Sequence, residues 1–501
     1  MKYKLACLLL VLILAACKAN VEDTAESTDK QIKHLVLIAI DTVRADTFFA
    51  PDQHQYSDRL SPWLKKARIY QQAQSVSPWT IPAVSTVLTG YFPNQHGAGR
   101  FPAEIANLKL QTPTAIHAGV KTVAERMTEQ GFRSRAASAH PWLSLKFGMQ
   151  RGFKNIAQLK TREEIDNWFE QYVIDWAESN PDRRNFAYLH YMEAHNQHTS
   201  KKKKDYFSRL TPEQIQQGLD WNQLQACKKG VKDKVCRRYL IYTQAVLGLR
   251  DSIASTMEIL EEQGYLDDTL VVVYSDHGEE FHDHRRQALK DNHDPRGIAG
   301  FGHGNSMYQE LLHVPVLVWN PADKTGRLIE NPVSLIDIAP SILNWLNIDI
   351  DAGILPGMLL DNAEKHAERA LYASNMAYGP EQIAVRDGNS KSIWNTVNDE
   401  SRYFDLAIDP LEKNLIQSDE LVLHFDQLTG DYINLASTSI GLAPEINKEQ
   451  LQHLKAIGYL QGNDNDTGKI KPAEANSEII NFSDISGSDS DDYTEAPDDE
   501  N

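Results

Sequence analysis

Four polar side chains have types and positions that suit metal-assisted chemistry, namely Asp41, Thr80, Asp276 and His277. Asp41 comes directly after an unbroken apolar run at residues 35–40, and Asp276 follows another at 269–274 with only Ser275 between. Such runs are typical of strands buried on both faces. Because ligands of open α/β sheets bind at the carboxyl ends of the strands, we expect both carboxylates at one edge of a sheet. Two acids and a histidine at that edge indicate a metal site.

Thr80 lies where the sequence predicts a turn followed by a short helix. Thr80 is a good N-cap, Pro82 suits the first turn, and Gly90 can end the helix. A threonine at this position is at the positive end of the helix dipole, beside free backbone amides that can hold an anion. The pattern favours stabilisation of an oxyanion at Thr80, although an ordinary capping threonine has the same local sequence.

The elements that must position these residues alternate along the chain. Apolar runs at 186–191 and 314–319 predict two more strands, and Pro315 in the second run suits a strand start or an edge strand. Helical patterns at 122–130 and 239–263 are each followed by a glycine that can cap the helix. Strands that alternate with helices predict an α/β fold with a doubly wound, mostly parallel sheet.

The sequence resembles the sulfatase family of the alkaline phosphatase superfamily over nearly all of positions 31–460. The motifs that carry the resemblance occur in the family's order: Ile38–Asp46, Thr80–Pro82, Leu88–Gly97, Ser275–Glu279, Gly302–Gly304 with Met307–Glu310, Val333–Pro340, Tyr403–Leu406 with Asp409–Pro410, and Leu454–Tyr459. The resemblance implies an alkaline phosphatase-like catalytic domain at 31–350 and a smaller C-terminal α+β subdomain at 351–460. The subdomain is expected to contain a short antiparallel sheet near 384–396 and 400–406.

Three departures from the family pattern concern the reactive site. Sulfatases carry Cys or Ser, the precursor of formylglycine, where this chain has Thr80. The arginine that usually follows is Val84, and the usual Asp-Asp and Asp-Asn pairs are Asp41-Thr42 and Asp276-His277. Threonine cannot form formylglycine, so the resemblance implies a variant with a threonine nucleophile.

By resemblance, one divalent metal is bound by Asp41, Thr80, Asp276 and His277. A site with an imidazole and few oxygen ligands favours zinc, with manganese or calcium as alternatives. A bound cation would lower the pKa of the Thr80 hydroxyl, which would then attack phosphorus or sulfur and form a covalent intermediate.

Further histidines are candidates for proton transfer or substrate binding. His195 matches the family's substrate histidine, although Glu193 and Ala194 before it depart from the usual motif, and His303 lies where sulfatases place a lysine. Either could act as a general acid. His140 has weak support as a residue of the substrate pocket. Three more histidines, for which a solvated loop is favoured over a second metal site, lie in a polar stretch: His282, His284 and His293.

The N-terminus has the pattern of a secretory signal, with Lys2 and Lys4 ahead of an apolar run. Residues 14–17 resemble a bacterial lipobox, so we expect a signal peptide at 1–16, lipidation of Cys17 and a linker at 17–30. This predicts a chain anchored by lipid in the bacterial cell envelope, and Lys18 favours the outer membrane, facing the periplasm.

Charge and cysteine content complete the sequence-based predictions. The net charge of −18 argues against a nucleic-acid partner, and more than half of it lies in 460–501. The acidic stretch 461–501 predicts a disordered tail. Cys227 and Cys236 are the two cysteines left in an oxidising compartment, and a local disulfide is favoured over two free thiols.

We therefore expect a lipid-tethered hydrolase of phosphate or sulfate esters, with phosphorus chemistry favoured because formylglycine cannot form. Its substrate would be a phosphorylated or sulfated small molecule or glycan. One alternative is a transferase that moves a phospho-substituent between envelope lipids or glycans. Another is a non-catalytic lipoprotein that binds anionic glycans, for which the missing arginine at Val84 is the best support.

Overall fold

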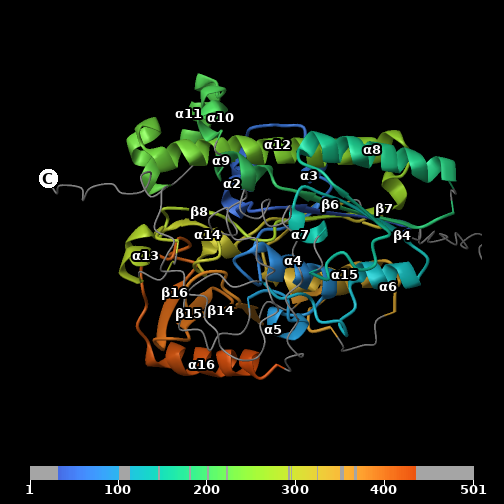
Figure 1. Cartoon of the computed structure of the whole chain (residues 1–501). Helices are drawn as coiled ribbons and strands as arrows, with labels where there is room; N and C mark the ends of the chain where they lie inside the picture. Colours follow the sequence, from blue (N-terminus) through green and yellow to red (C-terminus); the bar gives the residue numbers. More distant parts are fainter. Residues whose placement is uncertain are drawn as a thin grey trace, which may run out of the picture. The chain divides into compact units, whose positions relative to one another are not determined.

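An eight-stranded sheet lies at the centre of the structure, a computed structural model (Figure 1). The structure describes residues 32–435, except 101–112, 145–146, 180–181, 200–201, 222–223, 292–293, 295, 324, 350–354 and 366–368. The strand order is β11-β2-β10-β7-β1-β6-β4-β5. The bounds are β1 (His34–Ile40), β2 (Arg68–Tyr70), β4 (Arg133–Ser138), β5 (Asn155–Gln158), β6 (Asn185–Tyr191), β7 (Thr269–Tyr274), β10 (Val316–Trp319) and β11 (Arg327–Ile329).

Most neighbouring strands of this sheet are parallel. β1 pairs in parallel with both β6 and β7, and β4 pairs in parallel with β5 and β6. β10 is antiparallel to β7 and to β2, so the sheet is mixed. Pro315 lies just before β10, which is an internal strand, so this proline marks a strand start. The predicted α/β fold with a mostly parallel sheet is confirmed.

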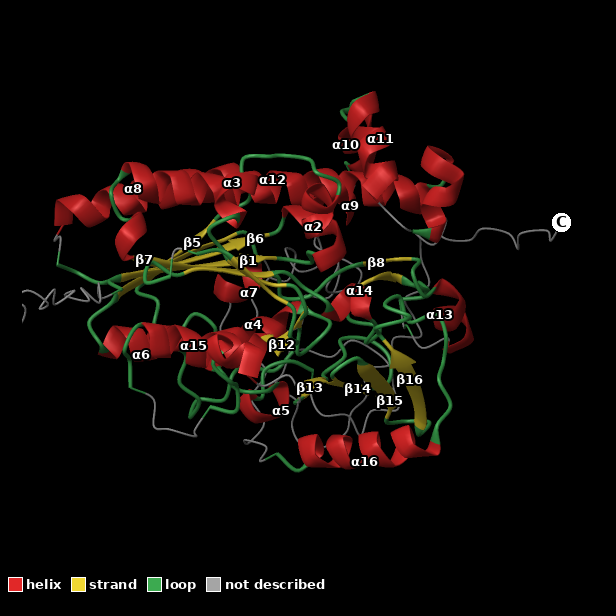
Figure 2. Ribbon diagram, turned by 180° about the vertical axis from the view of Figure 1, so that it is seen from behind, coloured by secondary structure: helices red, strands yellow, loops and turns green. Residues whose placement is uncertain are grey.

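Both faces of the sheet are buried, as the unbroken apolar runs predict. Leu35, Leu37 and Ala39 of β1 belong to one hydrophobic core, and Val36, Ile38 and Ile40 belong to the other. This alternation follows from the two-residue period of a strand. One face is covered by α2 (Ala45–Gln53), α3 (Ser61–Leu64), α8 (Arg162–Ser179) and α12 (Lys234–Glu262), and the other by α4 (Thr80–Thr89), α6 (Val123–Glu129) and α15 (Ile338–Trp345) (Figure 2).

Shorter elements connect these layers. The short strands form two pairs, β3 (Ala73–Gln74) with β12 (Val333–Ser334) and β8 (Glu280–Phe281) with β9 (Phe301–Gly302). The remaining helices are α5 (Pro93–His96), α7 (Pro141–Ser144), α9 (Glu193–Thr199), α10 (Lys203–Ser208), α11 (Pro212–Trp221), α13 (Arg285–Asp291), α14 (Gln309–Leu312) and the 3₁₀ helices η1 (Gln225–Lys232), η2 (Leu266–Asp268), η3 (Leu335–Asp337) and η4 (Leu360–Lys365).

A second, antiparallel sheet forms the C-terminal part of the described chain. Its strands are β13 (Ala370–Ala373), β14 (Gln382–Asp387), β15 (Ser390–Asn395) and β16 (Glu400–Asp405), in that order. Helix α16 (Asp419–Ile433) contributes Phe425 and Tyr432 to a core with Val385 and Tyr403 of this sheet. The predicted antiparallel sheet of the C-terminal subdomain is therefore present.

The predicted helices form, with one wrong start. α6 is capped by Thr122, which accepts a hydrogen bond from the backbone N–H of Glu125, and Gly131 follows it with a positive φ. α12 begins at Lys234 and not at 239, because the Asp233 carboxylate accepts hydrogen bonds from the N–H groups of Val235 and Cys236.

Several predictions fall outside the described residues. These are the signal peptide at 1–16, the lipidated Cys17, the linker at 17–30 and the acidic tail at 461–501. The predicted boundary between residues 350 and 351 also lies in an undescribed stretch. Among the residues that the structure describes, no helix is long and apolar enough to cross a membrane.

Candidate active site

The ends of β1 and β7 bring Asp41 and Asp276 together. The two strands are paired neighbours, with Ala39 opposite Tyr274, and each aspartate follows shortly after its strand. One ligand atom each from Asp41, Asp276 and His277 lies within 4.8 Å of the others, and all three residues are fully buried. The predicted meeting of these side chains therefore occurs in the structure.

The two carboxylates have oxygens that the protein leaves unpaired. Asp276 Oδ1 accepts hydrogen bonds from the backbone N–H groups of Thr42 at 3.2 Å and of His277 at 2.9 Å. Asp276 Oδ2 and Asp41 Oδ1 are buried and have no hydrogen-bond partner among the described residues. Because an unpaired buried carboxylate oxygen is costly, these atoms fit a site for a cation.

Burial and repulsion act on Asp41 in the same direction. Desolvation, followed by the nearby Asp276 carboxylate, raises the pKa of Asp41 well above its ordinary value. Two carboxylates that share a buried site favour proton uptake unless a positive charge is present. A divalent cation between them would supply that charge, and the chemistry of the residues present fits such an ion.

Thr80 contacts this cluster from the N-terminus of α4. The Thr80 Oγ1 atom lies 3.2 Å from His277 Nε2, and the Thr80 side chain is close enough to Asp41 to lower the pKa of that carboxyl. The prediction that Thr80 is the N-cap is wrong, because Trp79 holds the extended N-cap conformation and Thr80 is the first helical residue. The Thr80 hydroxyl thus faces the acidic cluster. Gly90 ends the helix in the left-handed conformation, as predicted.

The tautomer of His277 is set by its own backbone. His277 Nδ1 lies 2.9 Å from the carbonyl oxygen of Gly278, so the N–H at Nδ1 donates there and the lone pair of Nε2 faces Thr80. A Cβ atom at position 278 would lie 1.9 Å from the Glu310 carbonyl oxygen. The close packing of this turn therefore requires glycine at 278 and orients the neighbouring imidazole.

His190 is a residue of the site that the sequence analysis missed. It lies in β6, and its Nε2 atom is 3.2 Å from Asp41 Oδ2. Its Nδ1 atom is 3.1 Å from the hydroxyl of Tyr188, which lies 3.2 Å from the hydroxyl of Tyr274. Burial lowers the pKa of His190 to about 4, so the ring is neutral and can donate to Asp41 through Nε2 while it accepts from Tyr188 at Nδ1. A histidine inside an apolar strand run was the available signal.

The two predicted catalytic histidines lie next to the cluster. The ring centroid of His303 is 4.6 Å from that of His277 and 5.1 Å from that of His195. His303 Nδ1 lies 3.1 Å from the Glu279 carboxylate. His140 places Nε2 at 3.7 Å from Asp41 Oδ2. The structure brings all three together with the cluster, while their roles remain predictions.

Comparison with known proteins assigns the family. The sulfatase family model matches residues 33–348. The chain belongs to the sulfatase family. Among curated relatives, it is 26% identical to an arylsulfatase of Clostridium perfringens over 218 residues, which are 40% of this chain and 41% of the relative. It is 24% identical to a choline-sulfatase of Rhizobium meliloti over 191 residues, which are 36% of this chain and 33% of the relative. The matches thus span less than half of these relatives.

Solved structures show the same fold. A protein of glycosaminoglycan metabolism from Bacteroides thetaiotaomicron is similar with a TM-score of 0.59 and 15% identity, over 84% of this chain and 96% of that chain. The phosphonate monoester hydrolase of Agrobacterium radiobacter is similar with a TM-score of 0.58 and 16% identity, over 80% of this chain and 94% of that chain. At these identities, the likeness establishes the fold.

Compared with the family pattern, this chain has a core residue in place of an arginine. Val84 is 1% exposed and packs in the hydrophobic core beneath the sheet. Arg44, a buried arginine near the metal motif, is bound to the carboxylates of Asp46 and Asp283. Its charge is therefore already compensated by the protein.

The prediction of a solvated loop is wrong for His284. His284 is buried, and its Nδ1 atom lies 2.6 Å from Glu310 Oε1. Although burial opposes the charged form, the Glu310 carboxylate raises the pKa of His284 to about 9. Glu280, His284 and Glu310 have ligand atoms close enough for a metal, but a protonated His284 already balances a carboxylate. Burial lowers the pKa of the neighbouring His282 to about 4, and His293 lies outside the described residues.

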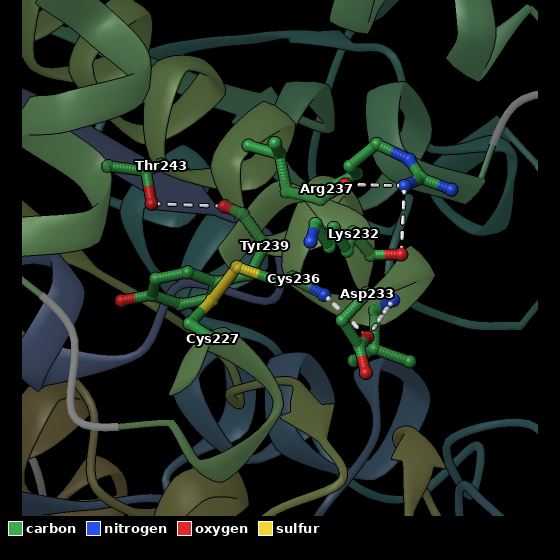
Figure 3. The surroundings of a disulfide bond; sticks show 9 residues. Cys227, Lys232, Asp233, Cys236, Arg237, Tyr239 and Thr243 are labelled. Carbon is green, nitrogen blue, oxygen red and sulfur yellow. Dashed lines mark hydrogen bonds between the residues drawn. A yellow bond between two sulfur atoms is a disulfide. The ribbon is translucent and has the colours of Figure 1, made fainter. Parts of the chain in front are cut away.

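A disulfide joins Cys227 and Cys236 at the start of α12 (Figure 3). Cys227 belongs to η1 and Cys236 to the first turn of α12, and their Cα atoms are 4.8 Å apart. Asp233 between them caps α12. The covalent link therefore closes the turn that leads into the longest helix described.

Proposed function

We propose that this sulfatase-family protein is a metal-dependent hydrolase of phosphate or sulfate esters that uses Thr80 as its nucleophile. The observation that carries the proposal is the position of Thr80 Oγ1, which is 3.2 Å from His277 Nε2 and close enough to the buried Asp41 to lower the pKa of that carboxyl. A side-chain hydroxyl in contact with an imidazole and a buried carboxylate is the usual arrangement of an activated nucleophile.

The residues that would hold the metal are Asp41, Asp276, His277 and Thr80. A divalent cation bound there would polarise the ester and lower the pKa of the hydroxyl. Two carboxylate oxygens without hydrogen-bond partners among the described residues and one imidazole nitrogen match the ligand preferences of zinc, with manganese or calcium as alternatives. His190 would hold Asp41 in the orientation that this site needs.

The chain's own groups account for the remaining steps. After its hydroxyl proton is lost to solvent, the Thr80 oxygen would form a bond to phosphorus or sulfur while the bond to the leaving oxygen breaks. Backbone N–H groups at the start of α4 would stabilise charge on the non-bridging oxygens. His195 or His303 would give a proton to the leaving oxygen. Water would then release the phosphate or sulfate from Thr80 and regenerate its hydroxyl.

The substrate class is proposed from the chain's own chemistry and from its relatives. The curated relatives are named arylsulfatase and choline-sulfatase, and a solved protein of this fold is a phosphonate monoester hydrolase. A solved protein of the same fold is in complex with a disulfated glucosamine, its substrate. Because Thr80 cannot become formylglycine, we favour phosphate esters over sulfate esters for this chain.

The test is turnover by the full-length protein after chelation and addition of single metals. Aryl phosphate monoesters, diesters and sulfates are assayed with the wild type, Thr80→Ala and His277→Ala. We expect both variants to lose at least about 1,000-fold in kcat, because a nucleophile or metal ligand acts as part of a unit. Acid quenching followed by mass spectrometry should detect a modified Thr80 in the wild type.

Two exposed residues provide matched controls. Thr325→Ala and His424→Ala remove the same side-chain types from exposed hydrogen bonds to Asp323 and Asp387, and should keep full activity. Undiminished turnover by Thr80→Ala would refute the nucleophile. Turnover of sulfates alone would reverse the preference for phosphorus, and product bound to an added alcohol instead of water would indicate a transferase.

A further inference from the structure

Arg100 is a buried cation that no carboxylate contacts among the described residues. It is 4% exposed, and its Nε and Nη2 atoms have no hydrogen-bond partner in the described part of the chain. The Nη1 atom donates to the backbone carbonyl oxygens of Met376 and Gly379. A buried guanidinium that is neither paired nor fully hydrogen-bonded is costly, so its retention calls for an anionic partner.

Hydrogen bonds through Asn375 connect Arg100 to Trp79, the N-cap of the helix that carries Thr80. The Asn375 side chain accepts from the Arg100 N–H at 2.8 Å and donates to the Arg100 carbonyl oxygen at 3.1 Å. The carbonyl oxygen of Asn375 accepts from the indole N–H of Trp79 at 2.6 Å. Trp79 directly precedes Thr80. The backbone of Arg100 is therefore linked to the proposed nucleophile through Asn375 and Trp79.

The same loop also reaches the histidines on the other side of the site. The N–H groups of Ala377 and Tyr378 both donate to the carbonyl oxygen of Gly304 at 2.9 Å. Gly304 follows His303, whose ring packs on that of His277. Segment 375–379 therefore borders the candidate active site from Thr80 to His303. Arg100 holds this segment through hydrogen bonds of its carbonyl oxygen and its guanidinium group.

The protein supplies little negative charge to balance Arg100. The nearest acid is Glu381, whose carboxylate accepts hydrogen bonds from the backbone N–H groups of Asn375 and Met376. Burial raises the pKa of Glu381 to about 7, so this group is only partly ionised at neutral pH. Burial also lowers the pKa of Arg100. An oxyanion bound at Nε and Nη2 would satisfy both donors in the planar geometry that guanidinium favours.

We propose that Arg100 anchors a second anion-binding subsite, which holds a sulfate, phosphate or carboxylate group of the substrate other than the ester that is cleaved. The inference rests on the proposed function and specifies its substrate class as polyanionic. Arg100 binds and orients the substrate and takes no part in bond cleavage. A substrate with a single anionic group leaves this subsite unused.

Anion binding to the metal-free, full-length protein tests the subsite without any turnover. Inorganic phosphate and sulfate are titrated calorimetrically into the wild type, Arg100→Ala, Arg100→Lys and the exposed control Arg59→Ala. We expect one anion to bind the wild type, about 10- to 100-fold weaker binding to Arg100→Ala and a smaller loss for Arg100→Lys, which keeps the charge without the fork. Thr80→Ala should bind as the wild type does. An equal affinity for Arg100→Ala, or no binding to the wild type, overturns the subsite.

Kinetics of the metal-loaded protein decide whether the anion belongs to the substrate. An aryl ester is compared with the same ester that bears an additional ring carboxylate or sulfate. For Arg100→Ala we expect a loss of about 10- to 100-fold in kcat/KM for the second ester only, mostly through KM. An equal loss for both esters, or a loss for neither, overturns the assignment to substrate. Failure of Thr80→Ala to lose activity would refute the proposed nucleophile and leave the anion-binding result intact.

Discussion

The carboxylate of Asp41 is held by a chain of polar contacts from β6 and β7. His190 contacts Asp41 Oδ2, Tyr188 contacts the other nitrogen of His190, and Tyr274 contacts Tyr188. Since His190 is neutral, its single N–H has one consistent direction, towards Asp41. Such outer partners fix the position and basicity of a ligand, and removing them weakens metal binding.

We expect His190→Ala to weaken metal affinity by about 10- to 100-fold, while His190→Gln, which can still donate a hydrogen bond, loses less. Tyr188→Phe should have an effect smaller than that of His190→Ala, because it removes only the contact that sets the tautomer. Competition with a chromophoric chelator measures these affinities directly, and His424→Ala serves as the control. Equal affinities for wild type and His190→Ala would show that Asp41 needs no support.

At this scale, the sequence predicted the residues that follow strand ends and missed the one inside a strand. Asp41, Asp276 and His277 interrupt or follow apolar runs, so their position at the sheet edge could be inferred from chain periodicity. His190 lies within such a run, and its contact with Asp41 spans 149 residues. A pairing over that distance depends on the strand order, which the sequence alone does not reveal.

Among the elements, α12 is the longest helix described, and a disulfide lies at its start. The disulfide Cys227–Cys236 closes a loop with a sequence separation of 9 directly over its N-terminal turn. Gly230 within the loop adopts a positive φ of 62°. The loop is thus held both by the Asp233 cap and by a covalent bond.

Loss of this disulfide should destabilise the protein without changing its reaction. In the chain-entropy model, a loop of this length contributes about 2–3 kcal/mol to the free energy of unfolding. We expect the double variant Cys227→Ser/Cys236→Ser to lose about that amount in denaturant unfolding and to keep the kcat of the wild type. Reduction of the wild type should give the same loss, and no further loss should follow reduction of the variant. A fall in kcat would link the loop to the active site.

Element boundaries show which sequence signals were read correctly. Glycine caps after the predicted helices at 122–130 and 239–263 located their C-terminal ends within a few residues. The start of α12 was placed too late, because Lys234, Arg237 and Arg238 mask its amphipathic pattern and only the Asp233 cap marks it. The helix at Thr80 begins one residue earlier than predicted. Thr80 was expected to be the N-cap, but Trp79 takes that position without a side-chain hydrogen bond.

At the scale of the whole described molecule, a buried polar network joins the segment after the metal motif to the C-terminal sheet. His284 donates through Nε2 to the carbonyl oxygen of Glu412 at 3.1 Å and pairs with Glu310 through Nδ1. The Glu412 carboxylate pairs with Lys391 of β15 at 2.7 Å. The His284 ring stacks on Tyr308 with centroids 3.6 Å apart. Such long-range pairs could not be predicted from the sequence, which placed His284 in a solvated loop.

The charge of His284 makes this junction dependent on pH. The pKa of His284 is about 9 in the folded protein and about 6.5 in an unfolded chain. A group whose pKa is raised by folding stabilises fully below its unfolded pKa, and this stabilisation is lost as pH rises through the folded value. For His284, the loss therefore falls between about pH 6.5 and pH 9, and amounts to about 3 kcal/mol at most.

We expect the difference in unfolding free energy between the wild type and His284→Gln to be largest at pH 6 and to shrink by about 2–3 kcal/mol by pH 9.5. Denaturant unfolding at both pH values measures this difference. The same measurement on His424→Gln is the control, because it shows how much of the change any histidine substitution would cause. His424 is an exposed histidine paired with Asp387, so its substitution should change stability by about 0–1 kcal/mol at either pH. A difference for His284→Gln that stays constant with pH would mean that His284 is neutral in the folded protein. The close contact with Glu310 would then be a hydrogen bond between a neutral imidazole and a carboxylate, and the junction would owe its stability to packing on Tyr308.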